Sequence, residues 1–451
     1  MNTPVYDFLR KYAGSQTLRM HMPGHKGVSA AEELHGAYAL DITEITGADS
    51  LFEAEGIIAE SEKNASSLFG TEETVYSCGG STLCIQAMLY LMKQENRRVI
   101  AGRTVHRAFL NACILLGLQV TWVYPHEEDG ILSGKYDPAD FEKALAGLNG
   151  ESGCVYITSP DYTGNMQDIA AISEICRKYD APLLVDNAHG AHLAFTEERL
   201  HPMQLGADLC CDSAHKVLPC LTGCAYLHTS NPRYKGRLKN AMSMFGSTSP
   251  SYLMLCSLDL CNVFLEDQCR KKLREISADA EELKSSLEGK YIFRKNGDPL
   301  HITIDTAAMG WDGRRLGEQL EAMGCYPEYA GREAVVLLLS AAEPWEDILL
   351  LEAALGGCEP VPDSGQAEKP PAFPRPMQAM DMREAALSSS EMVPVREAEG
   401  RICAGVKVPC PPAVPVVISG EVIDRSVIET LEFYGIDDVM AVTERRQSFI
   451  M

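Results

Sequence analysis

The sequence predicts an α/β fold in which a mostly parallel, seven-stranded sheet is covered by helices on both faces. One observation is that seven short apolar runs alternate with amphipathic segments of helical length from residue 71 to about residue 230. A second is that polar residues follow directly after several of these runs, where parallel sheets bind their ligands. The runs cover residues 74–77, 99–101, 120–124, 154–158, 182–185, 209–211 and 224–227.

The segments between the runs have the apolar spacing of amphipathic helices, so each is expected to connect one strand to the next. We assign residues 71–290 to one large domain, which ends in a long helix predicted over residues 250–290. The connecting helices are predicted near residues 83–94, 107–116, 138–148 and 169–179.

The rest of the chain divides into shorter units. Residues 1–70 form an N-terminal segment with helices predicted at residues 6–12 and 57–68. Residues 291–357 predict a smaller α/β domain, with a strand at 300–304, a helix at 314–323 and a strand at 334–339. Residues 358–377 are rich in Pro and polar residues and are typical of a linker. Residues 378–451 form the predicted C-terminal domain, which contains a helix near residues 425–434.

Composition narrows the class of protein. The chain has 451 residues and a formal net charge of −23, which argues against nucleic acid or an anionic membrane as a partner. It has neither an N-terminal signal pattern nor an apolar stretch of about 18 residues that could cross a membrane. Its 16 cysteines lie mainly in apolar runs, as Cys113 and Cys154 do. This is typical of reduced thiols, so we expect a cytoplasmic protein.

Four polar features mark the predicted carboxyl edge of the sheet. Residues 77–82 place two glycines and then two hydroxyls before a helix, an arrangement that suits a phosphate group. Asp186 follows a buried strand, and Lys216 lies shortly after another strand, directly after His215 and close to Ser213. His106 begins the helix at 107–116. Taken alone, these features have simpler explanations: a capped helix, a helix-capping carboxylate, an exposed lysine and a helix-end histidine.

Together the four features fit one cofactor, pyridoxal 5'-phosphate (PLP). PLP requires an amine for its aldehyde, an anion site, a counter-charge for its ring nitrogen and a flat group against its ring. A lysine near a strand end can be desolvated, which lowers its pKa and makes it a nucleophile toward an aldehyde. We therefore predict that PLP is held as a Schiff base on Lys216.

The sequence around Lys216 also resembles a known family. Residues 213–216 look like the Ser-x-His-Lys signature of the ornithine/lysine/arginine decarboxylases, which are fold-type-I PLP-dependent enzymes. The length is similar to that of the shorter members, which lack an N-terminal wing domain. Further matching segments are residues 21–27, 41–44, 56–60, 79–82, 186–192, 411–415 and 419–421.

The resemblance implies a role for each matching residue. Lys216 forms the Schiff base, Asp186 pairs with the ring nitrogen and keeps it protonated, and His106 stacks on the ring. It also implies a homodimer or a higher homo-oligomer, and decarboxylation of arginine, lysine or ornithine to the amine and CO2 in polyamine biosynthesis. The resemblance further implies that Ser81, Thr82, Ser213 and His215 hold the phosphate and that Ala188 and His189 lie near the ring or the substrate, with Gly80 as a further cofactor contact.

Three positions depart from the family pattern. Val28 stands where a glycine is usual, Cys410 where an aromatic is common and Ala413 where a glycine is expected. The last two lie in a region that helps to shape the substrate pocket, so the choice among the three amino acids stays open. The acids that would bind the distal cation stay open as well, with Glu44, Asp49 and Glu53 as candidates by position.

Other functions remain possible at this stage. A PLP-dependent aminotransferase would use the same ring-binding residues, and a PLP-binding protein without activity would keep them too. A metal site is disfavoured, because the His-x3-His segment at residues 21–25 contains Pro23 and Gly24 and is not helical, and because Cys220/Cys224 has no second cysteine pair at standard spacing. The candidate ligand pairs are His21/His25, His189/His192, and Cys220/Cys224 with His228.

Overall fold

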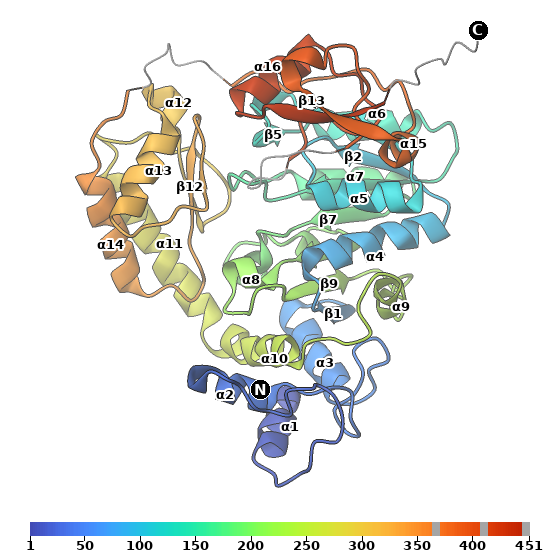
Figure 1. Cartoon of the computed structure of the whole chain (residues 1–451), viewed down its shortest axis with the longest axis vertical. Helices are drawn as coiled ribbons and strands as arrows, with labels where there is room; N and C mark the ends of the chain where they lie inside the picture. Colours follow the sequence, from blue (N-terminus) through green and yellow to red (C-terminus); the bar gives the residue numbers. More distant parts are fainter. Residues whose placement is uncertain (363–369, 406–413, 444–451) are drawn as a thin grey trace.

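The computed structural model describes the chain except for residues 363–369, 406–413 and 444–451, and the side chains of residues 127–129. Figure 1 shows a large central sheet, with the N-terminal helices below it, a small lobe at one side and a C-terminal lobe above. No helix in these described ranges is long and apolar enough to cross a bilayer. The predicted domain boundaries themselves stay a prediction.

The predicted seven-stranded sheet is confirmed. Its strand order is β1-β9-β8-β7-β6-β2-β3, and β9 runs against the other six, which share one direction. The carboxyl ends of those six strands therefore meet at one edge. The bounds are β1 Glu73–Ser77, β2 Arg98–Gly102, β3 Val120–Val123, β6 Gly153–Thr158, β7 Leu183–Asp186, β8 Leu209–Asp212 and β9 Ala225–Thr229.

The four predicted connecting helices are also confirmed, on both faces of the sheet. They are α4 (Gly80–Gln94), α5 (Arg107–Leu116), α6 (Pro138–Ala146) and α7 (Ile169–Lys178). Apolar side chains of α4 and α5 share one core with the sheet, and those of α6 and α7 share another. Asp137 and Asp168 are the N-caps of α6 and α7, because each side chain accepts a backbone N–H of the first turn.

The prediction of one long helix over residues 250–290 is wrong. The segment forms α10 (Tyr252–Asp267) and α11 (Cys269–Ser286), and Gln268 between them has φ −128°. The break lets the two helices pack against different elements. Helix α10 packs on α1 (Pro4–Ala13) and α3 (Ile57–Phe69), whereas α11 packs on α14 (Trp345–Gly357) of the small lobe.

The small lobe and the C-terminal lobe contain the remaining sheets. The predicted strand, helix and strand of the small lobe are confirmed as β10 (His301–Ile304), α13 (Gly313–Ala322) and β12 (Val335–Leu338). The C-terminal lobe pairs β13 (Ser390–Pro394) with β14 (Asp438–Val442). The other elements are α2 His35–Leu40, β4 Glu127–Asp129, β5 Ser133–Lys135, α8 Ala214–Val217, α9 Leu238–Ser243, α12 Thr306–Met309, β11 Tyr329–Ala330, α15 Met382–Leu387, the predicted α16 Arg425–Phe433, and the 3-10 turns η1 Glu32–Leu34, η2 Ala191–Phe195, η3 Pro202–Gln204 and η4 Val395–Glu397.

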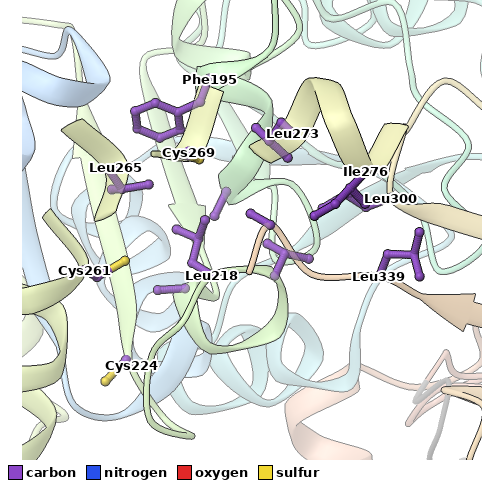
Figure 2. Close-up of a cluster of buried hydrophobic side chains, with 14 of the residues drawn as sticks. Phe195, Leu218, Cys224, Cys261, Leu265, Cys269, Leu273, Ile276, Leu300 and Leu339 are labelled. Atoms are coloured by element: carbon purple, nitrogen blue, oxygen red, sulfur yellow. The ribbon is translucent and has the colours of Figure 1, made fainter. Parts of the chain in front are cut away.

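One continuous apolar core joins the large sheet to the small lobe. Figure 2 shows part of it, where Leu218 from the loop after α8 lies among side chains of α10, α11 and the small lobe. Leu273 and Ile276 of α11 point into the same core as Leu300 and Leu339. The core therefore fixes the segment that follows Lys216 against two neighbouring lobes.

Candidate active site

The carboxyl edge of the sheet brings most of the predicted site residues around one pocket. It is formed by the ends of β6 and β7, by α8 and by the first turns of α4 and α5. The predicted residues that line it are Ser81, His106, Asp186, Ala188, His189 and Lys216.

Asp186 is the last residue of β7 and is buried. Its carboxylate accepts hydrogen bonds from the Tyr156 hydroxyl at 3.0 Å, from the Ala188 N–H at 3.3 Å and from Cys211 Sγ at 3.6 Å. Burial and the neighbouring Asp186 raise the pKa of Tyr156 well above its usual value, so its hydroxyl remains a donor. These donors are uncharged, and a buried carboxylate is stabilised further by a cationic N–H. The geometry suits a protonated ring nitrogen.

Lys216 lies on the short helix α8, directly after β8. Its Nζ donates to Nε2 of His189 across 2.8 Å. Burial lowers the pKa of His189 well below its usual value, and the positive charge of Lys216 lowers it further. The imidazole is therefore neutral and serves as an acceptor for the lysine.

His106 caps α5, because its Nδ1 accepts the N–H of Ala108 at 3.1 Å. This bond fixes the plane of the imidazole where it lines the pocket with Asp186 and Lys216. Burial is the main cause that lowers the pKa of His106, so a neutral, flat ring faces the pocket.

The predicted phosphate seat lies at the N-terminus of α4. Gly80 begins this helix with φ +64°, and a Cβ built there meets nothing within 4 Å. Ser213 Oγ donates to Ser81 Oγ at 2.9 Å, which brings two hydroxyls together beside the helix end. Backbone N–H groups and hydroxyls in this arrangement bind anions well. Thr82 is exposed and does not line the pocket.

His215 also lies outside the pocket lining, and its Nδ1 donates to the carbonyl of Cys224 at 2.9 Å. Burial lowers its pKa, so the ring is neutral and its other nitrogen is left for a further partner. The roles of Thr82 and His215 in binding phosphate stay predictions.

Several pocket residues were missed from the sequence. Thr158 is the last residue of β6, Pro160, Asp161 and Tyr162 follow that strand, and Thr104 follows β2. The rule that points to residues at strand ends would therefore have found all five. No local signal marks the other two, Leu132 and Val414, because neither directly follows a strand of the large sheet.

A wider cleft reaches Lys216 from the side of the small lobe. Residues 323–328 and 337–339 line it, together with the acids Glu343 and Asp347 at the start of α14. The Tyr162 hydroxyl donates to Glu328 Oε1 at 2.9 Å, so one tyrosine joins the pocket to this cleft. The cleft gives a small molecule a route to the lysine.

The acids proposed from position for a distal cation lie elsewhere. Asp49 accepts backbone N–H groups of Glu55, Gly56 and Ile58, which stabilises the start of α3. Although burial alone raises the pKa of Asp49, these hydrogen bonds lower it. Neither Glu44, Asp49 nor Glu53 lines the pocket or the cleft.

The metal-ligand pairs considered from the sequence do not gather into a site of three ligands among the described residues. In that part of the chain, the group with ligand spacing is His201, Cys210 and Asp212. Asp212 already accepts hydrogen bonds from His201 at 2.9 Å and from His228 at 3.1 Å. This buried cluster joins the carboxyl ends of β7 and β8, because Asn187 also donates to Asp212 at 2.7 Å.

The three departures from the family pattern fall in different places. Val28 is 66% exposed and does not line the pocket. Cys410 and Ala413 lie outside the described residues. The other 15 of the 16 cysteines are described, and each of these is a free thiol.

Comparison with known proteins identifies the family. The description "Orn/Lys/Arg decarboxylase, major domain" matches residues 3–309, and "Orn/Lys/Arg decarboxylase, C-terminal domain" matches residues 367–436. The arginine decarboxylase of Bacillus subtilis (strain 168) is 28% identical over 447 residues, which cover 93% of this chain and 91% of that protein.

Solved structures share the fold. The lysine decarboxylase of Francisella novicida superposes with a TM-score of 0.81 at 15% identity, over 98% of this chain and 81% of that one. Lysine decarboxylase A of Pseudomonas aeruginosa gives a TM-score of 0.79 at 18% identity, over 96% of this chain and 76% of that one. The predicted fold class is therefore confirmed. Because the major-domain match spans more than half of the sequence, this chain belongs to the Orn/Lys/Arg decarboxylase family and is an amino-acid decarboxylase.

Proposed function

We propose that the protein decarboxylates a basic amino acid with PLP carried on Lys216. The observation that supports this best is the arrangement around one pocket. The Lys216 amine, the buried Asp186 carboxylate, the flat ring of His106 and the hydroxyl of Ser81 all line it. These are the amine, counter-charge, stacking group and anion donor that PLP needs.

The residues fit the cofactor on structural grounds. Asp186 is buried with uncharged donors, so a cationic ring N–H would complete its surroundings. Open space lies beside Gly80 at the helix end, where a phosphate would be held with the Ser81 and Ser213 hydroxyls. Thr158 Oγ1 and His189 Nδ1 are buried at the pocket without a hydrogen-bond partner in the structure.

Each side chain then has a defined part in the reaction. When bound, PLP supplies an aldehyde for the substrate amine and a ring that accepts the electron pair left by loss of CO2. Asp186 would keep a proton on the ring nitrogen, and Tyr156 and Ala188 orient the Asp186 carboxylate. His106 would lie flat against the ring. Lys216, which His189 holds in place, would carry the cofactor.

Arginine is the first substrate to test, and lysine and ornithine are the alternatives. The curated relative described above is named an arginine decarboxylase and matches nearly the whole chain, whereas the two solved neighbours are named lysine decarboxylases. The cleft that ends at Lys216 carries Glu328, Glu343 and Asp347, which favours a cationic amino acid.

We also propose a cytoplasmic homodimer or higher homo-oligomer, acting in polyamine biosynthesis. The N-terminal segment exposes several large apolar side chains, which a second copy would cover. They are Leu18, Met20, Met22, Val28 and Leu34, exposed by 79%, 82%, 54%, 66% and 48%. Sedimentation of the purified protein tests the oligomeric state, and a monomer at micromolar concentration would rule out the homo-oligomer.

The decisive experiment combines spectroscopy with product analysis. The protein is incubated with PLP, its absorbance is recorded before and after borohydride, and CO2 release is measured from arginine, lysine and ornithine. We expect an absorbance band that borohydride removes, reduced PLP attached to Lys216, and CO2 from one of the three amino acids. Lys216→Ala should lose both signals, whereas Lys235→Ala, at an exposed ion pair, should keep them.

Asp186→Asn should still bind PLP but lose at least about 100-fold in turnover, because the ring nitrogen would no longer be held protonated. Full activity in Lys216→Ala would overturn the proposal. A PLP band without CO2, and with dependence on a keto acid, would identify an aminotransferase instead.

A further inference from the structure

A second buried cluster of charged groups lies behind the Lys216 pocket. Asp298, just before β10, has its carboxylate Oδ1 at 3.1 Å from His192 Nε2 and at 3.2 Å from His301 Nδ1. The side chains of all three residues are completely buried. Although burial alone raises the pKa of the Asp298 carboxyl, the two imidazoles lower it below its usual value. The cluster therefore contains an ionised carboxylate inside the protein.

This cluster adjoins the lysine through one residue, His189. The ring of His301 packs against the ring of His189, with centroids 5.5 Å apart and planes inclined by 35°. Nε2 of His189 accepts from Lys216 at 2.8 Å. A chain of contacts thus runs from Asp298 through His301 and His189 to Lys216.

The hydrogen-bonding roles along this chain are complementary. A neutral His189 that accepts at Nε2 must carry its hydrogen on Nδ1. A neutral His301 with its hydrogen on Nδ1, toward Asp298, must accept at Nε2. His189 Nδ1 and both ring nitrogens of His301 are buried without a hydrogen-bond partner in the structure, so the 3.2 Å contact between His301 Nδ1 and Asp298 lacks hydrogen-bond geometry. A small rotation of the His301 ring would direct its Nδ1–H to Asp298, and its Nε2 would then accept from His189 directly or through a bridging water.

Other groups near His189 do not supply this donor or acceptor. Lys216 on α8 and His106 at the start of α5 both disfavour a positive charge on His189. The ring of Tyr162 meets His189 edge-on at 5.4 Å, while its hydroxyl donates to Glu328. Asp298 is the carboxylate that favours positive charge on His189.

We propose that Asp298 is a positioning residue that fixes the ring tautomers of His301 and His189, so that His189 always presents an acceptor to Lys216. The lysine amine is then held in one orientation toward the pocket, both before the cofactor binds and after each turnover. Its importance for catalysis rests on the proposed role of Lys216, but the tautomer assignment does not.

The test uses the full-length protein without cofactor and reads the ring nitrogens directly. Histidine 15N chemical shifts report which nitrogen of His189 carries hydrogen. We expect the Nδ1–H form in the wild type and a mixture with the Nε2–H form in Asp298→Asn. Asp259→Asn removes a buried carboxylate that bonds Val5, Tyr6 and Ser61, so it should leave His189 unchanged.

A second measurement follows PLP capture by the same proteins across pH. Loss of the acceptor and of the nearby negative charge both destabilise the Lys216 ammonium. The midpoint of the capture-rate profile should therefore move to lower pH by about one unit in Asp298→Asn. Asp298→Glu, which keeps the charge, should restore much of the wild-type midpoint, an effect that a merely structural role would not produce.

Three results would overturn the inference: an unchanged His189 tautomer in folded Asp298→Asn, an unchanged midpoint, or equal shifts in Asp259→Asn. If Asp298→Asn does not fold, His301→Phe decides instead, because it keeps a ring against His189 but removes the acceptor. An unchanged tautomer there would also refute the relay. Failure of the wild type to capture PLP would refute the proposed function and leave the 15N result to decide the relay.

Discussion

Replacing Arg103 by Met should loosen the C-terminal lobe, because it breaks a buried ion pair. Arg103 follows β2, and its guanidinium donates to the Pro415 carbonyl at 3.0 Å and to the Val416 carbonyl at 3.4 Å. It also lies 3.3 Å from the carboxylate of Glu421, and the two side chains are 0% and 2% exposed. The same residue therefore ties the sheet to the segment that contributes Val414 to the active-site pocket.

The expected cost follows from this burial. Removing one partner of a buried, hydrogen-bonded ion pair costs about 3–5 kcal/mol. Burial already raises the pKa of Glu421, although Arg103 opposes this. Without Arg103 that opposition is lost, and protonation of the carboxyl would limit the loss to the lower end of this range, about 3 kcal/mol. Replacing both partners by Met should recover most of this loss, since no buried charge is left unpaired.

Native-state hydrogen exchange measures this effect locally, which suits a multi-lobed chain that need not unfold in one step. Peptides covering residues 414–442 should exchange about 100-fold faster in Arg103→Met, since each 1.4 kcal/mol corresponds to a factor of ten. Arg396→Met is the control in the same lobe, because its pair with Glu432 is exposed and should not matter. Exchange at the wild-type rate in Arg103→Met would refute the reasoning. So would a double variant that loses as much stability as the two single variants lose in sum.

Two further predictions follow from buried titratable groups. Burial raises the pKa of Asp259 from 3.8 to about 6, so the folded state keeps a proton that the unfolded state has released. The wild type should lose about 3 kcal/mol of stability as pH rises through that window, and thermal melts of Asp259→Asn should lack this slope. Burial also raises the pKa of the Cys84 and Cys154 thiols to about 12, so both should resist alkylation at pH 8 until urea unfolds the protein. Rapid labelling of either cysteine in the native protein would contradict their burial.

Much of the fold could be predicted because each connection in the large sheet is short and locally marked. Apolar runs gave all seven strands, and capping residues such as Asp137 and Asp168 stand where the helices begin. The break at Gln268 was not predictable, because no Gly or Pro marks it within residues 252–286. Only the different partners of α10 and α11 explain it. Helix α14 was missed because its run of leucines and alanines shows no polar face that separates helix from strand.

The candidate site likewise contains residues that local sequence marks and residues that it does not. Asp186, Lys216, His106 and Ser81 stand next to strand ends, so sequence position alone predicts that they meet. The residues that hold them in place come from elsewhere in the chain. Asp298 lies more than a hundred positions from His192, and no spacing rule connects them. Family resemblance assigned a phosphate role to Thr82, yet its side chain is exposed, so local sequence did not settle its orientation.

The pocket depends on contacts among three parts of the chain. Tyr162 of the large sheet is held by Glu328 of the small lobe, and Val414 enters from the C-terminal lobe beside Arg103. Lys216 itself is followed by Val217, whose carbonyl accepts the N–H of Ala341 at 3.1 Å. A substitution that loosens either lobe should therefore disturb the lysine or the pocket wall before it unfolds the sheet. For this reason Arg103→Met should lower turnover even where the large sheet stays intact, and loss of stability in the lobes and loss of activity should appear together.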